Sequence, residues 1–377
     1  MRPNKKDGIS IYVIGARGIP DIQGGIEKFC SKVYPLMVSQ HGNNITMLTM
    51  KKYGNVDSIW NGVNIKTLSS VGNVKIEKLV YNVFSTLYCL YKRPDVVHVH
   101  SIASGTFVFL LRLFGLKVLC RYNSQDYLYP KWGKLARLIL KWGELNFILS
   151  NYVIYNSGQY KRILEKKINK DKLLFVPNGI DFDLPKVEAS TIEIKGITLK
   201  PGKYLLSTGR ITPEKGFDIL LDAFDRSGLA KEYYLIIAGD FDLKDSYTQQ
   251  LCRNHKLNNV IFSGFLSTRK LRDLYRNCVL YVSSSRFEGM SNSVLEAIGY
   301  GCKVLLSDIP GNAQLLLDKK YYYESENSLR LSEKMVSLVL ESARPEYAEL
   351  REKYDWKKIA ETINLIDSKM LNTKFMS

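Results

Sequence analysis

The sequence is poor in cysteine and histidine, and it lacks an apolar run long enough to cross a membrane. Its six cysteines stand singly among apolar residues, and none forms the C-x-x-C pair typical of zinc sites and redox motifs. We therefore expect no structural metal and no disulfide framework, and we predict that the cysteines are buried in a reducing compartment. The longest candidate for a membrane span, residues 106–119, contains Arg112 and Lys117 and falls short of the about 20 apolar residues needed.

Secretory, repetitive and low-complexity segments are also missing. Residues 1–8 are polar and lead directly into a short apolar run, which indicates a first strand and not a signal peptide. No repeat occurs at the periods typical of solenoids. A length of 377 residues with 45% hydrophobic and 24% charged residues is typical of a globular protein of two domains. We expect a cytoplasmic protein without a spanning helix.

Positive charge is concentrated in the first half of the chain. The total is 54 Lys+Arg against 37 Asp+Glu. Residues 1–170 hold 25 of these cations and 9 of the acids, a net of +16, which leaves 29 against 28 for the remainder. This asymmetry indicates that one domain faces an anionic surface, either a nucleic acid or the cytoplasmic leaflet of a membrane.

Apolar segments alternate between strand and helix periods in both halves of the chain. In the first half we predict strands at residues 9–15, 45–49, 63–68, 96–100, 118–122 and 153–156, and helices at 27–40, 75–91, 105–114 and 131–150. In the second half we predict strands at 204–208, 233–238, 260–263, 280–283 and 303–307, and helices at 216–227, 247–255, 268–276 and 291–300. Two such runs predict an α/β protein with two doubly wound parallel sheets.

The alternation stops between the two runs, which sets the expected domain boundaries. We predict a first domain at 1–182, a linker at 183–202, a second domain at 203–345 and a C-terminal helical segment at 346–377 that packs back on the first domain. Ligands of such sheets bind beyond the carboxyl ends of the strands, so we expect the active site in a cleft between the domains.

The clearest local motif is S-R-F-E-G-M-S-N-S-V-L-E-A at residues 285–297, which follows a predicted strand and opens a helix. Backbone N–H groups at a helix N-terminus bind anions, so this segment can receive a diphosphate. Glu296, about two turns into the helix, can accept from ribose hydroxyls, and Glu288 can bind hydroxyls of a sugar. A capped helix with a solvated Glu296 would give the same pattern. The candidate diphosphate-binding residues are Gly289, Met290, Ser291 and Asn292.

A second motif, T-G-R-I-T-P-E-K-G, follows the first predicted strand of the second domain, at residues 208–216. Arg210 and Lys215 are placed to clamp a diphosphate and to offset the charge of a leaving nucleotide. Loop cations are often only solvated, but two such motifs at matching strand ends favour a common ligand.

Together these two motifs resemble the donor domain of the retaining GT-B glycosyltransferases of family 4. That resemblance implies two Rossmann-like domains facing across a cleft, a nucleotide-sugar donor, and Glu288, His100, Arg210 and Lys215 as catalytic residues. It extends to V-P-N-G-I-D at 176–181 and to a glycine loop containing Gly24 and Gly25, which would contact the donor. His98 and His100 share one face of their predicted strand, and we select His100 because it is nearer the carboxyl end.

A narrower resemblance involves G-A-R-G-I-P at 15–20 and K-W-G at 131–133, as in a subgroup that contains bacterial rhamnosyltransferases of surface-polysaccharide synthesis. That subgroup has an acidic D-G-x-E-W-x-R stretch before K-W-G. Here residues 123–129 read N-S-Q-D-Y-L-Y, and Asp126 is the candidate acceptor-binding residue.

Two D-x-D strings, at 181–183 and 240–242, are interpreted as loop acids. With Arg210 and Lys215 available to balance a diphosphate, we expect no metal and no other cofactor. A nicotinamide dehydrogenase is disfavoured, because the first turn is G-x-x-G and no acid ends a second strand about 20 residues later.

These residues predict a retaining glycosyltransferase that moves a hexose, N-acetylhexosamine or rhamnose, from a UDP-sugar or secondly dTDP-rhamnose, to a polyprenyl-diphosphate-linked acceptor. The pathway would be synthesis of O-antigen, capsule or exopolysaccharide. A basic first domain whose helices mix cations with large apolar residues favours peripheral attachment to the anionic inner leaflet of the cytoplasmic membrane. No nucleic-acid-binding motif is present. Alternatives are a nucleotide-sugar 2-epimerase of the same fold and a non-enzymatic basic membrane-binding scaffold.

Overall fold

The computed structural model describes the greater part of the chain. The described residues are 8–20, 22, 24–53, 57–68, 77–128, 132–182, 190–240, 245–254, 259–343 and 345–372, with the side chains of Cys252 and Asn254 excepted. The chain divides into two compact units: unit 1 comprises residues 1–179 and 354–377, and unit 2 comprises residues 180–353.

Unit 1 is built on one eight-stranded sheet with the order β3-β4-β2-β1-β5-β6-β7-β8. All neighbouring pairs are parallel except β3 and β4. The strands are β1 (Ser10–Ile14), β2 (Asn44–Met50), β3 (Ser58–Trp60), β4 (Val63–Leu68), β5 (Val96–His100), β6 (Lys117–Tyr122), β7 (Tyr152–Tyr155) and β8 (Leu173–Phe175). The central strand β5 is buried at every position, including its two histidines, as is usual where helices cover both faces of a parallel sheet.

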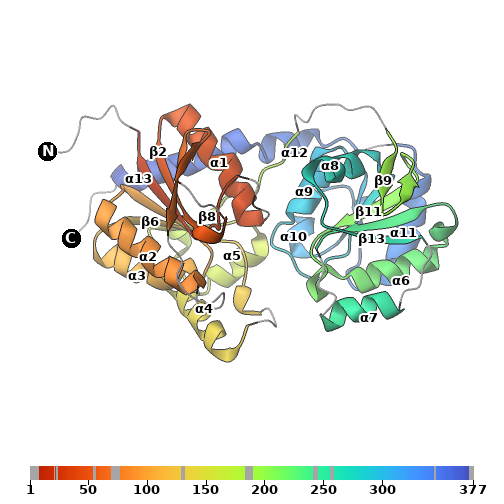
Figure 1. Cartoon of the computed structure of the whole chain (residues 1–377), viewed down its shortest axis with the longest axis horizontal. Coiled ribbons are helices and arrows are strands. Elements are labelled where there is room, and N and C mark those ends of the chain that lie inside the picture. The colour runs from red at the N-terminus through yellow and green to blue at the C-terminus, as the bar shows by residue number, and fades with distance from the viewer. Residues whose placement is uncertain are drawn as a thin grey trace. The chain divides into compact units, whose positions relative to one another are not determined.

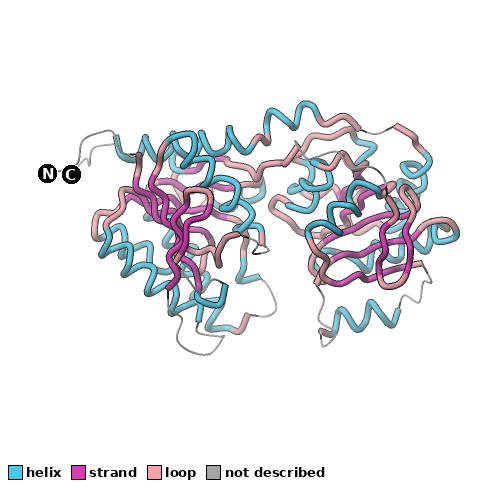
Figure 2. The backbone as a smooth tube through the Cα atoms, turned by 45° about the horizontal axis from the view of Figure 1, so that its top comes forward, coloured by secondary structure: helices cyan, strands magenta, loops and turns pink. Residues whose placement is uncertain are grey.

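The helices of unit 1 lie between its parallel strands in the sequence, except the last, which follows unit 2 (Figures 1 and 2). They are α1 (Gly25–His41), α2 (Glu77–Lys92), α3 (Val108–Leu113), α4 (Lys134–Asn146), α5 (Gly158–Leu164) and α13 (Trp356–Asn372). The segment predicted as one helix at 131–150 is shorter, because it begins at Lys134 within the described residues and ends in the 3-10 turn Phe147–Leu149.

The last helix of the chain belongs to unit 1, where α13 packs against α1 (Figure 1). Its apolar face joins the core formed by α1 and the first strands, and it includes Trp356, Ile359 and Ile363. A Cβ at Gly179 would lie 2.3 Å from the ring of Trp356, so only glycine allows this contact. The C-terminal segment therefore completes the core of the first domain.

Unit 2 is a six-stranded, wholly parallel sheet with the order β13-β12-β11-β14-β15-β16. The strands are β11 (Tyr204–Thr208), β12 (Tyr234–Ala238), β13 (Val260–Gly264), β14 (Leu280–Ser283), β15 (Val304–Ser307) and β16 (Tyr322–Tyr323). The helices are α6 (Phe217–Ser227), α7 (Ser246–Asn254), α8 (Thr268–Asn277), α9 (Asn292–Gly299), α10 (Pro310–Ala313), α11 (Ser328–Leu340) and α12 (Ala348–Lys353). The prediction of two doubly wound α/β domains is confirmed.

The predicted boundaries need two corrections. The linker prediction at 183–202 is wrong over its second part, because β9 (Ile192–Ile194) and β10 (Ile197–Leu199) form an antiparallel hairpin there. Its K-G turn places Lys195 and Gly196 at positive φ, a turn signal in a stretch too short to show a period. Residues 183–189 lie outside the described residues. The segment 346–377 is also divided, because α12 lies in unit 2 and α13 in unit 1.

Two predictions about single residues and helices can be compared directly with the structure. The side chains of Cys30, Cys89, Cys120, Cys278 and Cys302 are buried, as expected. Among the described residues, none of the helices has the length and apolarity required to span a bilayer.

Candidate functional site

The candidate donor site of unit 2 is formed by the loops that follow β11 and β14, which are neighbours in the sheet. Gly209 follows β11 with φ +149°, and a Cβ there would lie 3.1 Å from Cε of Lys215. Glycine therefore lets the aliphatic chain of Lys215 lie close over the backbone of its own loop. The ammonium group of Lys215 forms an ion pair with Oε1 of Glu288, on the loop after β14. The structure thus brings together two residues predicted to be catalytic.

Backbone contacts hold these two loops against each other. The amide of Arg286 donates to the carbonyl of Glu214 at 2.8 Å, and Oγ of Ser284 donates to the carbonyl of Lys215 at 2.9 Å. Gly216 has φ +63°, and a Cβ there would lie 2.1 Å from the carbonyl oxygen of Ser284. A side chain at position 216 would push the loops apart.

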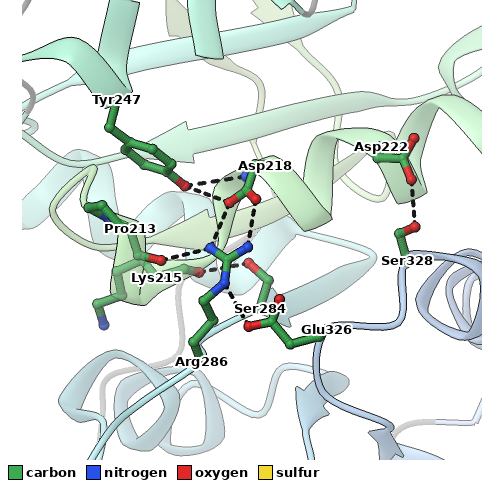
Figure 3. A network of polar contacts seen from close by, with 9 residues as sticks. All are labelled: Pro213, Lys215, Asp218, Asp222, Tyr247, Ser284, Arg286, Glu326 and Ser328. Atoms are coloured by element: carbon green, nitrogen blue, oxygen red, sulfur yellow. Dashed lines mark hydrogen bonds and ion pairs between the residues drawn. The ribbon is translucent and has the colours of Figure 1, made fainter. Parts of the chain in front are cut away.

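Arg286 adds a network of charged hydrogen bonds around the same two loops (Figure 3). Its Nη1 and Nη2 donate to the two carboxylate oxygens of Asp218 at 2.8 and 2.6 Å, and Nη1 also donates to the carbonyl of Pro213 at 2.8 Å. Its Nε donates to Oε1 of Glu326 at 2.7 Å, and Tyr247 donates its hydroxyl proton to Asp218 at 2.7 Å. Bidentate pairing of this kind fixes a guanidinium in one orientation.

The pKa values of both partners follow from these contacts. Partial burial of Asp218 would raise its pKa, but the hydrogen bonds from Arg286 and Tyr247 outweigh burial and lower it. The same hydrogen bond to Asp218 raises the pKa of Arg286 against its own partial burial. Both groups are therefore charged at neutral pH.

Glu296 lies on α9 and is linked to the end of β11 through the hydroxyl of Tyr275. Its Oε2 accepts a hydrogen bond from the hydroxyl of Tyr275 at 3.1 Å, and that hydroxyl also lies 2.8 Å from Oγ1 of Thr208. Burial raises the pKa of Tyr275 well above its usual value, so its phenol stays a proton donor. Glu296 is thus oriented by protein contacts, which differs from the solvated carboxylate of an ordinary capped helix.

The segment 289–292 leads into α9 and is fixed from the side by α10. Gly289, Met290 and Ser291 are buried, and Ser291 occupies the N-cap position without a side-chain capping bond. A Cβ at Gly311 would lie 2.2 Å from the carbonyl oxygen of Glu288, and Nε2 of Gln314 donates to the carbonyl of Gly289 at 3.0 Å. The helix begins at Asn292, as the diphosphate-binding prediction requires. Arg210 is exposed and has no ion pair within the described part of unit 2.

In unit 1, the predicted glycine loop precedes α1. Gly24 has φ +153°, and a Cβ there would lie 2.0 Å from Oε2 of Glu27. Glu27 is buried and accepts from Nε of Arg17 at 2.9 Å, from its Nη2 at 3.2 Å and from its backbone amide at 3.0 Å. Gly24 therefore makes room for a carboxylate that ties the turn after β1 to the start of α1, and Gly25 begins that helix.

His100 is buried at the carboxyl end of β5, with its Nε2 2.6 Å from the hydroxyl of Tyr34. Burial, together with the nearby Arg121 and His98, lowers the pKa of His100 well below its usual value, so its ring is neutral. His98 is equally buried and lies 3.0 Å from the same hydroxyl through Nδ1. Strand alternation thus places both rings on one face, as predicted.

Other predicted residues lie apart from these contacts or outside the described residues. Asp126 begins a 3-10 turn, is partly exposed and accepts a hydrogen bond from Ser124. Asp183 and Asp242, the second acids of the two D-x-D strings, lie outside the described residues. So do Lys75, the first residue of the helix predicted at 75–91, and Lys131 of the K-W-G string. Over the described ranges, no three His, Cys, Asp or Glu side chains group in a way that could hold a metal ion.

The side chains that orient the motifs were not predicted from the sequence. Asp218 and Glu326 hold Arg286 across 68 and 40 residues of chain, and no local pattern pairs them. Asp367 contacts His98 from 269 residues away. The only available signal for Arg286 was its place inside the motif 285–297.

We expect Arg286→Gln to lower the free energy of unfolding at pH 7 by about 1–2 kcal/mol, with the lower figure favoured because both charges are partly exposed. Asp218 has a lowered folded pKa, so its contribution is present above the usual carboxyl range and is lost as pH falls through that lowered pKa. The difference from the wild type should therefore narrow below a pH of about 4. Denaturant unfolding at several pH values measures this, with Arg226→Gln, a single exposed pair with Asp222, as the matched control. Equal losses in the two variants would contradict the role given to Arg286.

Two protein-family models match the chain, one in each half. The model described as Glycosyltransferase Family 4 matches residues 25–184, and the model described as Glycosyl transferases group 1 matches residues 190–360. The second match contains both motifs of unit 2.

Three curated relatives show similarity over about two thirds of the chain. An uncharacterized 41.2 kDa protein in the cps region of Klebsiella pneumoniae is 25% identical, covering 68% of this chain and 69% of its own length. A UDP-Gal:alpha-D-GlcNAc-diphosphoundecaprenol alpha-1,3-galactosyltransferase of Escherichia coli is 24% identical, covering 64% and 65%. An N-acetylgalactosamine-N,N'-diacetylbacillosaminyl-diphospho-undecaprenol 4-alpha-N-acetylgalactosaminyltransferase of Campylobacter jejuni is 24% identical, covering 68% of both.

Solved structures confirm the expected fold. Sucrose-phosphate synthase from Thermosynechococcus elongatus matches with a TM-score of 0.74 and 16% identity, over 96% of this chain and 98% of that one. Anabaena HepE in complex with UDP-glucose matches with a TM-score of 0.68 and 14% identity, over 95% and 99%. The chain is therefore a glycosyltransferase with the GT-B fold, and it consists of a Glycosyltransferase Family 4 domain at residues 25–184 and a Glycosyl transferases group 1 domain at residues 190–360.

Proposed function

We propose that the protein is a retaining glycosyltransferase that moves a hexose, N-acetylhexosamine or rhamnose from a nucleotide-diphosphate sugar to a polyprenyl-diphosphate-linked acceptor. A UDP-sugar is the favoured donor and dTDP-rhamnose the second. The observation that carries this proposal is the Lys215–Glu288 pair at the carboxyl ends of the adjacent strands β11 and β14. This is the edge of a parallel sheet at which nucleotides bind.

Different residues of unit 2 would bind different parts of the donor. Arg210 and Lys215 would neutralise the diphosphate, the amides of residues 289–292 would bind its oxygens, and Glu296 would bind the ribose. Glu288, which is paired with Lys215, would accept hydrogen bonds from sugar hydroxyls. In a retaining transfer the acceptor hydroxyl attacks from the face that the diphosphate leaves, so charge stabilisation and positioning do the catalysis.

In unit 1, Gly24 and Gly25 let the backbone approach the donor, and His100 stands at the transferred sugar. Asp126 is assigned to the acceptor. Two relatives whose names specify diphosphoundecaprenol-linked sugars support an acceptor of the same chemical class, and a relative from a cps region supports capsule or O-antigen synthesis. An N-acetylhexosamine or hexose donor agrees with the names of the same two transferases.

The experiment that tests the function has two stages. A panel of UDP-, dTDP- and GDP-sugars is first screened for protection of the full chain against thermal unfolding. The protective donor is then incubated with undecaprenyl-diphosphate-linked N-acetylglucosamine, and the lipid product is analysed for a new glycosidic bond and its anomeric configuration. Transfer with retained configuration supports the proposal. Interconversion of the donor at C2 without transfer would establish the epimerase, and no binding of any donor would favour a non-enzymatic scaffold.

Removing the cations of the donor site should leave the fold intact and impair turnover. We expect Lys215→Ala and Arg210→Ala each to lower kcat about 10²–10³-fold, as does the loss of one preorganised charge-stabilising group. Arg226→Ala, an exposed arginine of the same unit, is the matched control and should retain full activity. A folded double variant with wild-type turnover would remove the donor-site assignment.

We propose that no metal ion or other cofactor takes part. Two cations and the N-terminus of α9 can together offset the charge of a diphosphate. Activity should therefore persist in excess chelator, and added magnesium or manganese should change kcat little. An absolute requirement for either ion would instead implicate one of the two D-x-D strings.

We further propose that unit 1 binds the anionic surface of the cytoplasmic leaflet through α2, α3 and α4. The helix α3 contacts both α2 and α4, and apolar side chains project to solvent at helical spacing. The exposed residues are Leu79, Val83, Phe84 and Leu87 on α2, and Leu135, Leu138, Trp142 and Leu145 on α4. Leu135 and Leu138 are 73% and 64% exposed, far more than a helix face packed into a core. Lys134, Arg137 and Lys141 accompany them on α4, which is the composition of an interfacial helix.

The protein should sediment with anionic vesicles at low salt, dissociate at high salt and ignore neutral vesicles, because each cation near an anionic surface adds about 1 kcal/mol that salt screens. Leu138→Ser combined with Trp142→Ser should weaken sedimentation about tenfold or more through lost apolar burial. Leu365→Ser, 62% exposed on α13 of the same unit, should have no effect. Absence of vesicle binding, with a water-soluble sugar glycosylated as well as a lipid-linked one, would contradict both the membrane surface and the acceptor.

A further inference from the structure

Four buried side chains of unit 1 form a continuous chain of hydrogen bonds, which we call the histidine chain: Asp367, His98, Tyr34 and His100. Oδ1 of Asp367, on α13, lies 2.9 Å from Nε2 of His98. Nδ1 of His98 lies 3.0 Å from the hydroxyl of Tyr34, and this hydroxyl lies 2.6 Å from Nε2 of His100. The chain thus joins the last helix of the protein to the histidine assigned to the transferred sugar.

Each end of the histidine chain is an unpaired atom. At one end, Oδ2 of Asp367 is buried without a hydrogen-bond partner within the described residues, and at the other end the unpaired atom is a ring nitrogen of His100. Nδ1 of His100 is buried and has no hydrogen-bond partner within the described part of unit 1. The space around the rings is lined by Phe29, Leu119, Ile154 and Ile363 together with Arg121. A polar atom without a partner in such surroundings costs free energy unless it serves another purpose.

The direction of each hydrogen bond in the histidine chain depends on a single proton. Burial raises the pKa of Tyr34 well above its usual value, so its hydroxyl keeps one proton and must donate to one ring and accept from the other. The ring of His100 is neutral, as shown above, and carries one proton. The direction in which the hydroxyl of Tyr34 donates therefore determines which nitrogen of His100 carries this proton.

The protonation state of the Asp367–His98 pair determines to which histidine the hydroxyl of Tyr34 donates. With Asp367 ionised and His98 neutral, Nε2 of His98 donates to the carboxylate, and its bare Nδ1 accepts from Tyr34. Tyr34 then accepts from Nε2–H of His100, which leaves a lone pair on Nδ1 of His100. If the pair takes up one proton, on either partner, Nδ1 of His98 donates to Tyr34, and Tyr34 donates to Nε2 of His100. The proton of His100 then sits on Nδ1.

Other groups around the pair do not replace this coupling. The titratable side chains that interact with the pair are Tyr34 on α1 and His100 on β5. Cys30 on α1 interacts in turn with Tyr34, and Arg121 on β6 with both Tyr34 and His100. Arg121 donates to the side chains of Asn123 and Asn178 at 2.6 Å each, and its guanidinium lies 3.2 Å from the ring centre of Phe29. Burial of Asp367 raises its pKa, with His98 opposing, which brings proton uptake by Asp367 nearer to neutral pH.

We propose that Asp367 is a positioning residue. Through His98 and Tyr34 it holds His100 in the tautomer with its proton on Nε2 and presents the lone pair of Nδ1 to a hydroxyl group of the transferred sugar. One proton taken up by the Asp367–His98 pair reverses the histidine chain and turns Nδ1 of His100 from an acceptor into a donor. The contact with the sugar rests on the function proposed above, whereas the coupling of tautomers does not.

The test uses the ring nitrogens of the full chain, which contains only four histidines. In ¹⁵N-histidine-labelled protein, long-range ¹H–¹⁵N spectra report the tautomer of each ring, and His98→Gln and His100→Gln variants assign the signals. We expect both rings to carry the proton on Nε2 at pH 8. On acidification, His100 should shift toward the Nδ1–H tautomer together with proton uptake at the Asp367–His98 pair.

A cycle of substitutions separates coupling from a general structural role. Asp367→Asn should shift the ring nitrogens of His100 in the wild-type background. It should leave them unchanged in a Tyr34→Phe background, where the chain is cut. An equal shift in both backgrounds, or no shift in either, would overturn the proposal. If the variants fail to fold, the acid titration of the wild type is the test. A His100 tautomer that stays unchanged while the Asp367–His98 pair takes up a proton would also overturn the proposal.

Activity provides a second readout that a structural role would not move. The wild-type profile of kcat against pH should have an acidic limb that follows the tautomer change of His100, and Tyr34→Phe should remove this limb. The spectra need no substrate, so a coupled titration in a protein without transferase activity would retain the positioning role and reject the proposed function. Transfer activity in a protein whose His100 tautomer does not follow the Asp367–His98 pair would retain the proposed function and reject the positioning role.

Discussion

The ion pair between Lys215 and Glu288 depends on two loops being held at a fixed separation. A partly exposed pair contributes little stability by itself, so it cannot bring the loops together. Their separation is set by the backbone bonds of Arg286 and Ser284 and by the close approach at Gly216. Arg286 then holds both loops through Asp218, Glu326 and the carbonyl of Pro213. The charges that could meet a diphosphate are thereby oriented before any ligand binds, which reduces the reorganisation that binding requires.

In unit 1 the polar groups are buried, and hydrogen bonds between buried side chains orient them. His98, His100 and Arg121 are each 2% exposed and lie on neighbouring strands of one sheet. Groups so deeply buried need hydrogen-bond partners, and the helices α1 and α13 provide them through Tyr34 and Asp367. The C-terminal helix is therefore part of the polar core of unit 1 as well as of its apolar core, where Trp356 packs over Gly179.

The two units also differ in what they expose. Unit 1 carries nearly all of the excess positive charge, and its helices α2 and α4 present apolar stripes to solvent. A stripe of large apolar side chains beside cations is stable at an interface between water and lipid, because each kind of side chain meets its preferred surroundings. Unit 2 carries the paired charges of the donor motifs instead. Acceptor lipid and nucleotide donor thus correspond to different chemical surfaces in the proposed function.

By itself, the sequence determined the two α/β domains, because alternating apolar periods report directly which faces of strands and helices are buried. It also located the motifs at 208–216 and 285–297, since strand ends and helix starts are local features. The pairing of these motifs could not be predicted from the sequence. The strands β11 and β14 become neighbours only when the 71 residues between them fold elsewhere in unit 2, and only then do Lys215 and Glu288 meet. The hairpin at 192–199 was not predicted, because strands of three residues are too short to show a period of hydrophobic residues. Asp367 reaches His98 because packing of α13 on α1 buries a carboxylate that then requires a donor, and long-range contacts of this kind leave no pattern in the local sequence.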